Sequence, residues 1–294
     1  MSNQVEGVIL KGIGGFYYVH TGRRQIECKA GGRLRLNRRE KPAVGDRVMV
    51  EERGEEGLIT QILPRKNFLQ RPPIANIDQL FIVASQASPV TDPYLIDKVS
   101  VIALRQGIQP ILVLNKQDVD PSQDFRLIYE KAGFPVLSTS AETGEGVEEL
   151  RQMLRGKVSA FTGNSGIGKS SLLNRLEEGV LMETGSISRI SRGRHTTRRV
   201  ELFFVAEGYL ADTPGFSSFD ISRMEHIPKE KLEQYFPEFE PFLGQCRFSG
   251  CAHCKEPDCA VDQGAREGAI APSRLESYRK LYEEMAQWKE WENK

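Results

Sequence analysis

Residues 163–170 constrain the fold of this chain more than any other part of the sequence. They read GNSGIGKS, follow the apolar run KVSAF and open a helical pattern, SSLLNRLEE. In such a strand-to-helix context, the glycines of a GxxxxGKS loop let successive backbone N–H groups wrap around phosphates at the positive end of the helix. The segment therefore predicts a phosphate-binding loop in a sheet of parallel strands.

Two side chains of this loop have the chemistry that a nucleoside triphosphate requires. A lysine at the position of Lys169 neutralises the β- and γ-phosphates, and a hydroxyl at the position of Ser170 ligates Mg²⁺. The loop alone does not distinguish ATP from GTP, so the base must be read elsewhere in the chain.

Residues 115–118, NKQD, follow another apolar run, PILVL, as guanine-reading NKxD loops do. Asp118 can accept hydrogen bonds from N1–H and the exocyclic amine of guanine, whereas adenine would leave this carboxylate unpaired. Four residues of this kind are also typical of a helix-capping loop. Ser140 and Ala141, which end the next apolar run, favour the guanine interpretation, because the backbone N–H of Ala141 can meet guanine O6 from that position.

The remaining nucleotide motifs come after the phosphate-binding loop. Residues 212–215, DTPG, match the DxxG element, in which Asp212 holds Mg²⁺ through water and the N–H of Gly215 contacts the γ-phosphate. Between the two motifs lies GRHTTRR, where we favour Thr196 over Thr197 as the threonine that ligates Mg²⁺.

The order of these motifs differs from that of an ordinary GTPase. The base-reading segments 115–118 and 140–141 precede the phosphate-reading segments 163–170 and 212–215. Contacts in a folded domain do not depend on where the termini lie, so such a sheet can still close. The order predicts a circularly permuted P-loop GTPase domain of the α/β class.

The residue after the DxxG glycine is Phe216, at a position where a glutamine often orients the attacking water. A phenyl ring cannot hydrogen-bond water, so either hydrolysis is slow until a partner helps or another side chain takes over. His195, in the loop that precedes the DxxG strand, can orient water or accept its proton near neutral pH. The neighbouring arginines leave open the alternative that His195 contacts nucleic acid.

Five short apolar or β-branched runs separated by glycine-rich turns fill the first part of the chain and indicate a small closed β-barrel of the OB type. Residues 1–72 carry 14 Lys/Arg against 8 Asp/Glu, whereas the whole chain has 40 of each. The basic excess favours a barrel that binds RNA over a spacer without a ligand.

From Gln79 onward, apolar runs alternate with helical patterns, which predicts a parallel sheet with helices on both faces. The helical patterns cover residues 93–106, 121–132 and 147–154. Residues 272–294 have apolar side chains at spacings of three and four, as in an amphipathic helix that docks its apolar stripe on a neighbour.

Four of the five cysteines lie between positions 246 and 259, beside a histidine. In a long chain without a signal peptide, this clustering favours metal ligation over a disulfide framework. Three thiols and one imidazole close a tetrahedral structural zinc site, for which we expect the ligands Cys246, Cys251, His253 and Cys259. Cys254 competes as a ligand, and we leave it out because it would crowd its neighbour His253.

The chain contains no run of about 18 apolar residues of the kind that spans a bilayer, and its opening residues lack the pattern of a signal peptide. We therefore expect a cytoplasmic protein without a membrane partner. A GTPase of membrane or transport systems is disfavoured, because no amphipathic helix has the basic face that lies on membranes.

In this combination the chain resembles the ribosome small subunit-dependent GTPase A family of bacteria. The resemblance rests on the N-terminal barrel, the order NKxD, SA, GxxxxGKS, GRHTT and DTPG, and the zinc loop C-x4-C-x-H-x5-C, and it covers nearly the whole chain. It implies a GTPase that binds rRNA of the small ribosomal subunit through the barrel and the zinc module, is activated by the subunit and acts in its late maturation. It also implies an apolar residue at Phe216 and a switch-loop histidine at His195, whereas Cys254 is not part of the family pattern.

We accordingly expect three domains: an OB-fold RNA-binding domain at 1–68, a permuted GTPase domain at 69–220 and an α-helical zinc-binding domain at 221–294. The ligands are GTP or GDP with Mg²⁺ and one structural Zn²⁺, and the partners of this monomer are the small ribosomal subunit, its rRNA and other assembly factors. A stable RNA-binding factor that holds GTP as a structural ligand is the alternative. The expected nucleotide site comprises Asn115, Lys116, Asp118, Ser140, Ala141, Gly163, Asn164, Ser165, Gly166, Ile167, Gly168, Lys169, Ser170, Ser171, Asp212 and Gly215, with Ser170 and Thr196 on magnesium and with His195, Lys169 and Thr196 in catalysis.

Overall fold

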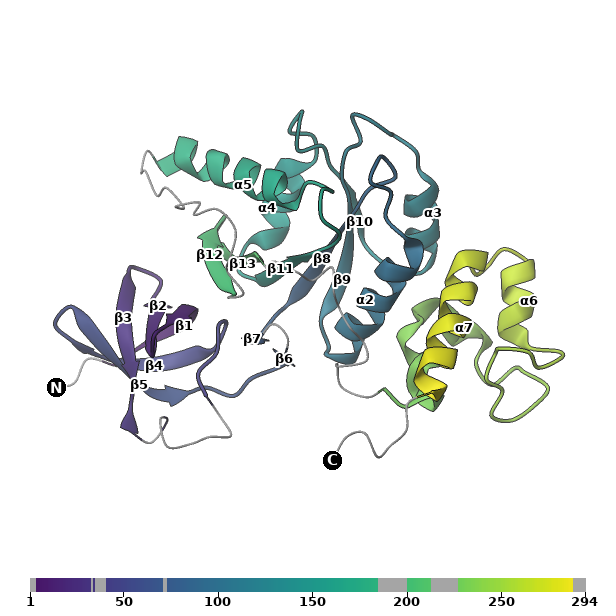
Figure 1. The fold of residues 1–294 in the computed structure, drawn as a ribbon, viewed down its shortest axis with the longest axis horizontal. Coiled ribbons are helices and arrows are strands. Elements are labelled where there is room, and N and C mark those ends of the chain that lie inside the picture. The colour runs from purple at the N-terminus through teal and green to yellow at the C-terminus, as the bar shows by residue number, and fades with distance from the viewer. Residues whose placement is uncertain are drawn as a thin grey trace. The chain divides into compact units, whose positions relative to one another are not determined.

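The computed structural model describes residues 4–32, 34, 41–70, 73–184, 200–212 and 227–287 (Figure 1). The chain divides into two compact units, and each unit contains segments from separate parts of the sequence. The first unit combines residues 1–80, 148–162 and 173–216, and the second combines residues 81–147, 163–172 and 217–294. His195, Thr196, Thr197, Gly215 and Phe216 lie outside the described residues, as does the side chain of Asp212.

The first unit begins with a closed barrel of five strands in the order β1-β2-β3-β5-β4 (Figure 1). β1 also pairs with β4 in antiparallel fashion, and β3 pairs with β5 in parallel fashion, which is the topology of an OB-fold. Alternate side chains point inward, as expected for strands with one buried face. The strands are β1 (Gln4–Ile13), β2 (Phe16–His20), β3 (Gln25–Ala30), β4 (Arg47–Arg53) and β5 (Glu56–Ile62). The predicted barrel is confirmed.

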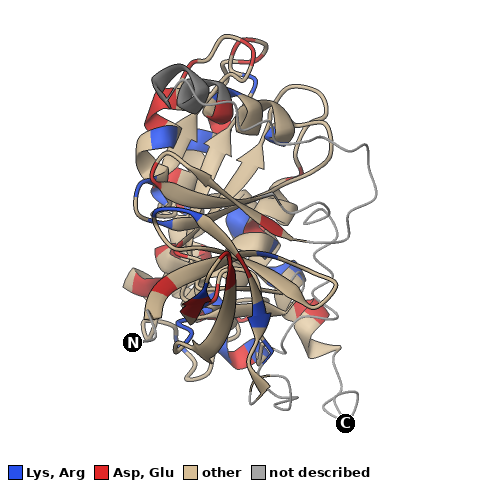
Figure 2. Cartoon of the chain, turned by 90° about the vertical axis from the view of Figure 1, so that its left-hand side faces the viewer, with Lys and Arg blue, Asp and Glu red and all other residues tan. Residues whose placement is uncertain are grey.

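Basic and acidic residues occur together on the barrel (Figure 2). Arg47 lies 2.6 Å from Glu6, and Arg65 lies 2.6 Å from the buried carboxylate of Asp46. The described strands are therefore less basic than the sequence total for residues 1–72 implies. Much of that excess comes from five arginines outside the described residues, namely Arg33, Arg35, Arg38, Arg39 and Arg71.

A six-stranded sheet has the order β10-β9-β8-β11-β13-β12. The chain enters it at β8, builds β9 and β10 on one side, and then builds β11, β13 and β12 on the other, as the permuted motif order requires. The strands are β8 (Gln79–Ala84), β9 (Gln109–Leu114), β10 (Val136–Ser138), β11 (Val158–Thr162), β12 (Glu201–Val205) and β13 (Gly208–Asp212). A separate two-stranded ribbon consists of β6 (Phe68–Gln70) and β7 (Pro73–Ala75).

One strand of this sheet runs against the predicted direction. β12 pairs antiparallel with β13, whereas β9 and β10, and likewise β11 and β13, pair in parallel. Only Ala206 and Glu207 separate β12 from β13, and both have positive φ angles, of 51° and 57°. Two such residues form a tight hairpin turn, and a parallel connection would need a dozen or more residues.

Helices flank the sheet strands along the chain, close to the predicted ranges. They are α2 (Pro93–Arg105), α3 (Asp124–Lys131), α4 (Val147–Leu154) and α5 (Lys169–Thr184). Asp92 caps α2, because its side chain accepts a hydrogen bond from the Tyr94 N–H at 2.9 Å. α3 begins three residues later than predicted, after a turn that Asp120 closes by accepting from the Ser122 N–H.

The C-terminal part of the second unit packs on α2. It contains the 3₁₀ helices η3 (Lys229–Tyr235) and η4 (Pro237–Phe242) and the α-helices α6 (Ala260–Arg266) and α7 (Pro272–Ala286). The apolar stripe predicted for residues 272–294 lies on α7 and joins Val101 of α2 in one buried cluster. Other members of this cluster are Leu232, Phe236, Phe239, Val261, Ile270, Leu275, Tyr278, Leu281 and Met285.

A fully buried ion network crosses the same interface. Arg274 of α7 donates to Asp97 of α2 at 2.7 Å and to Glu238 of η4 at 2.6 Å, and its side chain is 1% exposed. Tyr129 of α3 also donates to Asp97, at 2.9 Å. Burial alone would lower the pKa of Arg274, but the two carboxylates outweigh this effect and raise it. The guanidinium therefore stays charged and links three elements.

Replacing Arg274 by alanine should lower the free energy of unfolding by about 3 kcal/mol or more, because Asp97 and Glu238 would remain buried without their partner. Urea denaturation measures this change. Arg266→Ala is the matched control: its side chain is 80% exposed, and its loss should change stability by less than about 0.5 kcal/mol. Equal stability of the two variants would contradict the role given to the network.

In the part of the chain that the structure describes, we find no helix that could span a lipid bilayer.

Candidate nucleotide site and metal centre

The phosphate-binding loop joins β11 to α5 in a shape that only glycine permits at two positions. A Cβ on Gly163 would lie 2.2 Å from the Val83 carbonyl oxygen, and a Cβ on Gly168 would lie 2.3 Å from the Asn115 amide nitrogen. Both glycines also have positive φ angles, of 136° and 95°. The loop is therefore held tightly against the ends of β8 and β9.

Lys169 is the first residue of α5, and its ammonium lies over the loop. It donates to the carbonyl oxygens of Gly163 at 2.7 Å and of Asn164 at 2.5 Å. Ser170 and Ser171 follow in the first turn of α5 and are exposed. A cation, a hydroxyl and a helix N-terminus thus converge on one loop, which is the donor set that a polyphosphate with Mg²⁺ requires.

Asn115 links the base-reading segments to the phosphate-binding loop. Its amide nitrogen donates to the Ile167 carbonyl at 2.8 Å, and its oxygen accepts from the Ala141 N–H at 3.1 Å and from the Thr139 hydroxyl at 3.2 Å. The side chain is 2% exposed, so these bonds are shielded from water. The structure thereby brings together three motifs that lie far apart in the sequence.

Asp118 lies exposed at the same edge, and Ser140 orients its carboxylate through a hydrogen bond of 2.5 Å. The Ser140 hydroxyl in turn accepts from the Thr143 N–H at 3.1 Å. The predicted role of Ala141 toward guanine O6 remains a prediction, and in this structure its N–H donates to Asn115. An oriented and solvent-accessible carboxylate fits the paired donors on the edge of guanine.

Of the phosphate-reading residues after the loop, the structure describes only the backbone of Asp212. It is the last residue of β13 and pairs with Glu201 of β12. The predicted contacts of His195, Thr196 and Gly215 fall outside the described residues.

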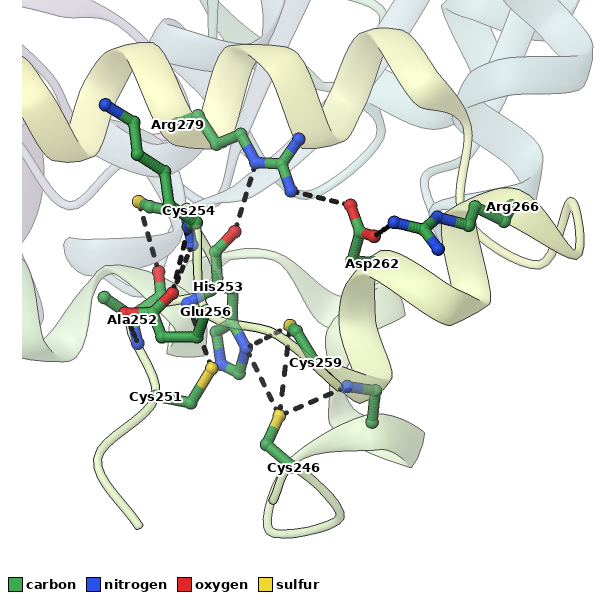
Figure 3. Close-up of polar contacts among 12 residues, drawn as sticks. Cys246, Cys251, Ala252, His253, Cys254, Glu256, Cys259, Asp262, Arg266 and Arg279 are labelled. Carbon is green, nitrogen blue, oxygen red and sulfur yellow. Dashed lines mark hydrogen bonds and ion pairs between the residues drawn. The ribbon is translucent and has the colours of Figure 1, made fainter. Parts of the chain in front are cut away.

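The cysteine-rich loop brings four ligand atoms together (Figure 3). The Sγ atoms of Cys246, Cys251 and Cys259 and a ring nitrogen of His253 all lie within 4.8 Å of one another. Cys246 Sγ lies 3.6 Å from His253 Nδ1 and 4.0 Å from Cys259 Sγ. Tetrahedral ligands at zinc–sulfur distances of about 2.3 Å are separated by roughly 3.8 Å, so the residues present fit zinc.

Neighbouring groups orient these ligands, and sequence analysis did not identify them. His253 Nε2 lies 3.1 Å from the Glu233 carboxylate, which leaves Nδ1 to face the three thiols. The Ala260 N–H donates to Cys246 Sγ and the His253 N–H to Cys251 Sγ, both at 3.4 Å, and such bonds stabilise thiolates. Glu233 comes from η3, so no local spacing pattern could have indicated it.

Cys254 points away from the other thiols (Figure 3). Its Sγ lies 3.3 Å from the Ala252 carbonyl, and burial raises the pKa of this thiol, which favours its protonated form. Glu256 organises the loop instead. Burial opposes its charge, but N–H donors that include those of Ala252, Cys254 and Lys255 outweigh burial and lower its pKa. The loop shape therefore does not depend on Cys254 as a ligand.

Arg279 of α7 attaches this loop to the rest of the module. It donates to the His253 carbonyl at 3.2 Å and to Asp262 of α6 at 2.7 Å (Figure 3). The four ligands are thus held between η3, α6 and α7, and nothing in this arrangement resembles the open site of a catalytic zinc.

Similarity to known proteins extends over nearly the whole chain. Residues 62–222 match the model of the RsgA GTPase family, and residues 6–59 match that of the RsgA N-terminal domain. A small ribosomal subunit biogenesis GTPase RsgA of Caldanaerobacter subterraneus is 44% identical over 288 residues, which are 96% of each chain. The RsgA of Geobacillus thermodenitrificans is 41% identical over 292 residues, covering 97% of this chain and 98% of that protein.

Two solved structures are similar along nearly the full length. YjeQ from Thermotoga maritima has a TM-score of 0.81 and 34% identity, covering 98% of this chain and all of that one. YloQ, a circularly permuted GTPase, has a TM-score of 0.80 and 32% identity, covering 98% of this chain and 96% of that one. Because a family model matches residues 62–222 and the similarity in sequence and fold covers nearly the whole chain, the chain belongs to the RsgA GTPase family and is a GTP hydrolase.

Proposed function

We propose that this GTP hydrolase acts in the biogenesis of the small ribosomal subunit, binding the maturing subunit and its rRNA and leaving after hydrolysis. The observation that carries the proposal is full-length similarity to relatives named small ribosomal subunit biogenesis GTPase. We place the protein in the cytoplasm as a monomer that works beside other assembly factors, with the domain limits 1–68, 69–220 and 221–294.

In this proposal, separate residues of the nucleotide site bind guanine and the phosphates. Asp118 and Ala141 read guanine, with Ser140 orienting the carboxylate, and Asn115 fixes their distance from the phosphate-binding loop. Lys169 compensates the charge that develops on the γ-phosphoryl oxygens. Ser170 and Thr196 would ligate Mg²⁺ directly, and Asp212 would hold it through water. When bound, Mg²⁺ would offset negative charge on the phosphates.

The zinc-binding module and the barrel are the proposed rRNA-binding parts. One structural zinc on Cys246, Cys251, His253 and Cys259 would fix the loop between η3 and α6. For the barrel, the OB-fold and the basic composition of residues 1–72 support this role.

The experiment that tests the proposal compares GTP turnover with and without purified small ribosomal subunits. We expect subunits to increase the steady-state rate, because their contact completes a catalytic site that has Phe216 where a water-orienting glutamine often stands. Large subunits at the same concentration are the control. Equal rates in all three samples would contradict the proposal and favour an RNA-binding factor for which turnover is incidental.

His195→Ala should lower the subunit-stimulated rate by about a hundredfold, the usual size of a contribution from one general base or water-orienting group. The dissociation constants for GTP and GDP should change much less. Stopped-flow phosphate release measures the rate, and subunit sedimentation measures binding to the ribosome. An unchanged stimulated rate combined with weaker subunit binding would leave His195 only a contact to RNA.

A further inference from the structure

The seven-residue loop 85–91 lies between β8 and Asp92, the N-cap of α2, and belongs to none of the nucleotide motifs. Two hydrogen bonds close its ends: the Thr91 N–H donates to the Ser85 carbonyl at 2.8 Å, and the Ser85 N–H donates to the Thr91 hydroxyl at 2.9 Å. The Ser85 hydroxyl donates to the Ala87 carbonyl at 3.0 Å. Ser85 is 0% exposed and Thr91 is 1% exposed, so water does not compete for these bonds. The loop therefore presents its tip in a fixed position.

The tip of this loop contacts the base-reading segment. The Ser88 carbonyl accepts a hydrogen bond of 2.7 Å from the ammonium of Lys116. Lys116 has a φ angle of +68°, in the left-handed region that residues other than glycine seldom adopt. Its backbone is held locally, because the Lys116 carbonyl accepts from the N–H groups of Val119 at 2.9 Å and Asp120 at 3.1 Å. The Ser88 carbonyl holds the other end of this residue, the ammonium of the side chain.

The same tip also contacts the phosphate-binding loop. A Cβ on Gly166 would lie 3.6 Å from Cγ of Pro89, so the proline ring is packed next to the backbone of that loop. The Gln86 amide donates to the Ser122 hydroxyl at 2.9 Å, which attaches the loop to the segment before α3. Residues 85–91 thus contact the base-reading segment and lie next to the phosphate-binding loop.

We propose that residues 85–91 form a third element of the nucleotide site and that Thr91 is its positioning residue. Thr91 fixes the loop ends, the fixed loop places the Ser88 carbonyl, and this carbonyl holds the Lys116 side chain in one orientation. Without the Thr91 hydroxyl, Lys116 is free before nucleotide binds and must be ordered on binding, which weakens affinity. The inference rests on the proposed guanine site at residues 115–118 and does not depend on ribosome binding.

The test measures dissociation constants for GDP and for a non-hydrolysable GTP analogue by calorimetry. Thr91→Val keeps the shape of the side chain but removes the acceptor of a buried N–H, and it should raise both constants about fivefold. Thr91→Ser restores the hydroxyl and should return them to within about twofold of the parent protein. Ser85→Ala removes the bond to Ala87 and gives a second, milder variant should Thr91→Val fold poorly.

A double-mutant cycle separates positioning from a general loss of stability. Lys116→Met should weaken nucleotide binding, and adding Thr91→Val to it should have an effect of less than about twofold, since Thr91 acts through Lys116. Thr60→Val is the matched control, because it removes a hydroxyl that donates to the Met49 carbonyl in the barrel, and it should leave both constants unchanged.

Four outcomes would overturn the proposal. Full additivity of Lys116→Met and Thr91→Val, or unchanged affinity in both Thr91→Val and Ser85→Ala, would show that the loop does not position Lys116. If Lys116→Met alone left the affinity unchanged, the guanine site itself would be misassigned, and the inference would fail with it. Loss of subunit-stimulated turnover with normal nucleotide affinity in Thr91→Val would also contradict the proposed role.

Discussion

Lys169→Ala is expected to lower kcat/KM for GTP hydrolysis by at least about a thousandfold while the chain remains folded. The ammonium of Lys169 lies over the phosphate-binding loop, within 2.7 Å of the Gly163 carbonyl and 2.5 Å of the Asn164 carbonyl. Its removal leaves the charge that develops on the transferred phosphoryl group without this cation. The contacts to those two carbonyls stay within the loop, so the apolar core of the sheet should be unaffected.

Phosphate release under single-turnover conditions measures this loss, and circular dichroism checks the fold. Lys231→Ala is the matched control, since Lys231 is an exposed lysine of η3 and its loss should leave basal turnover unchanged. Retained turnover in Lys169→Ala would refute the assignment of residues 163–170 as the phosphate-binding loop.

Removal of metal is expected to unfold the module around residues 246–259 before the sheet melts. Metal analysis should find about one zinc per chain, and Cys259→Ser should abolish binding. Cys259 is 5% exposed and belongs to the same apolar cluster as Phe239 and Tyr278. Structural zinc sites contribute roughly 10–16 kcal/mol in small domains, so the module cannot keep its packing without the ion.

Limited proteolysis with and without a chelator, followed by mapping of the cut sites, measures this local unfolding. Cys254→Ser is the control and should keep both the zinc and the resistance to proteolysis, because its Sγ lies against the Ala252 carbonyl and outside the four-ligand cluster. A zinc content well below one per chain, or equal resistance in Cys259→Ser and the parent protein, would argue against the site.

Sequence patterns predicted the features that depend on local chemistry. The glycines of residues 163–170 and the strands before each nucleotide motif defined the α/β domain, and the spacing of Cys246, Cys251, His253 and Cys259 defined the ligand cluster. The permuted order also predicted where the chain enters the sheet. Each of these features depends on a short segment whose residue pattern can be recognised without knowledge of the rest of the fold.

Features that depend on distant partners could not be predicted. In the sequence, Arg274 looks like any charged residue on a helix. Only the fold shows that it pairs with Asp97, 177 positions earlier. The antiparallel direction of β12 depends on Ala206 and Glu207, which take positive φ angles without the glycine or asparagine that usually marks such a turn. Likewise, no pattern relates the Ser88 carbonyl to Lys116, since a backbone group carries no sequence signal.

The burial of Val101 of α2 against α7 limits how far the chain can be shortened and still fold as a soluble protein. A fragment ending near position 220 would keep every nucleotide motif. It would also expose the face of α2 that is buried in one cluster with Leu275, Tyr278 and Leu281. Asp97 would also lose the cation that balances it. The C-terminal helices therefore cover an apolar face of the GTPase domain. Shortened versions that lack these helices should aggregate instead of hydrolysing GTP.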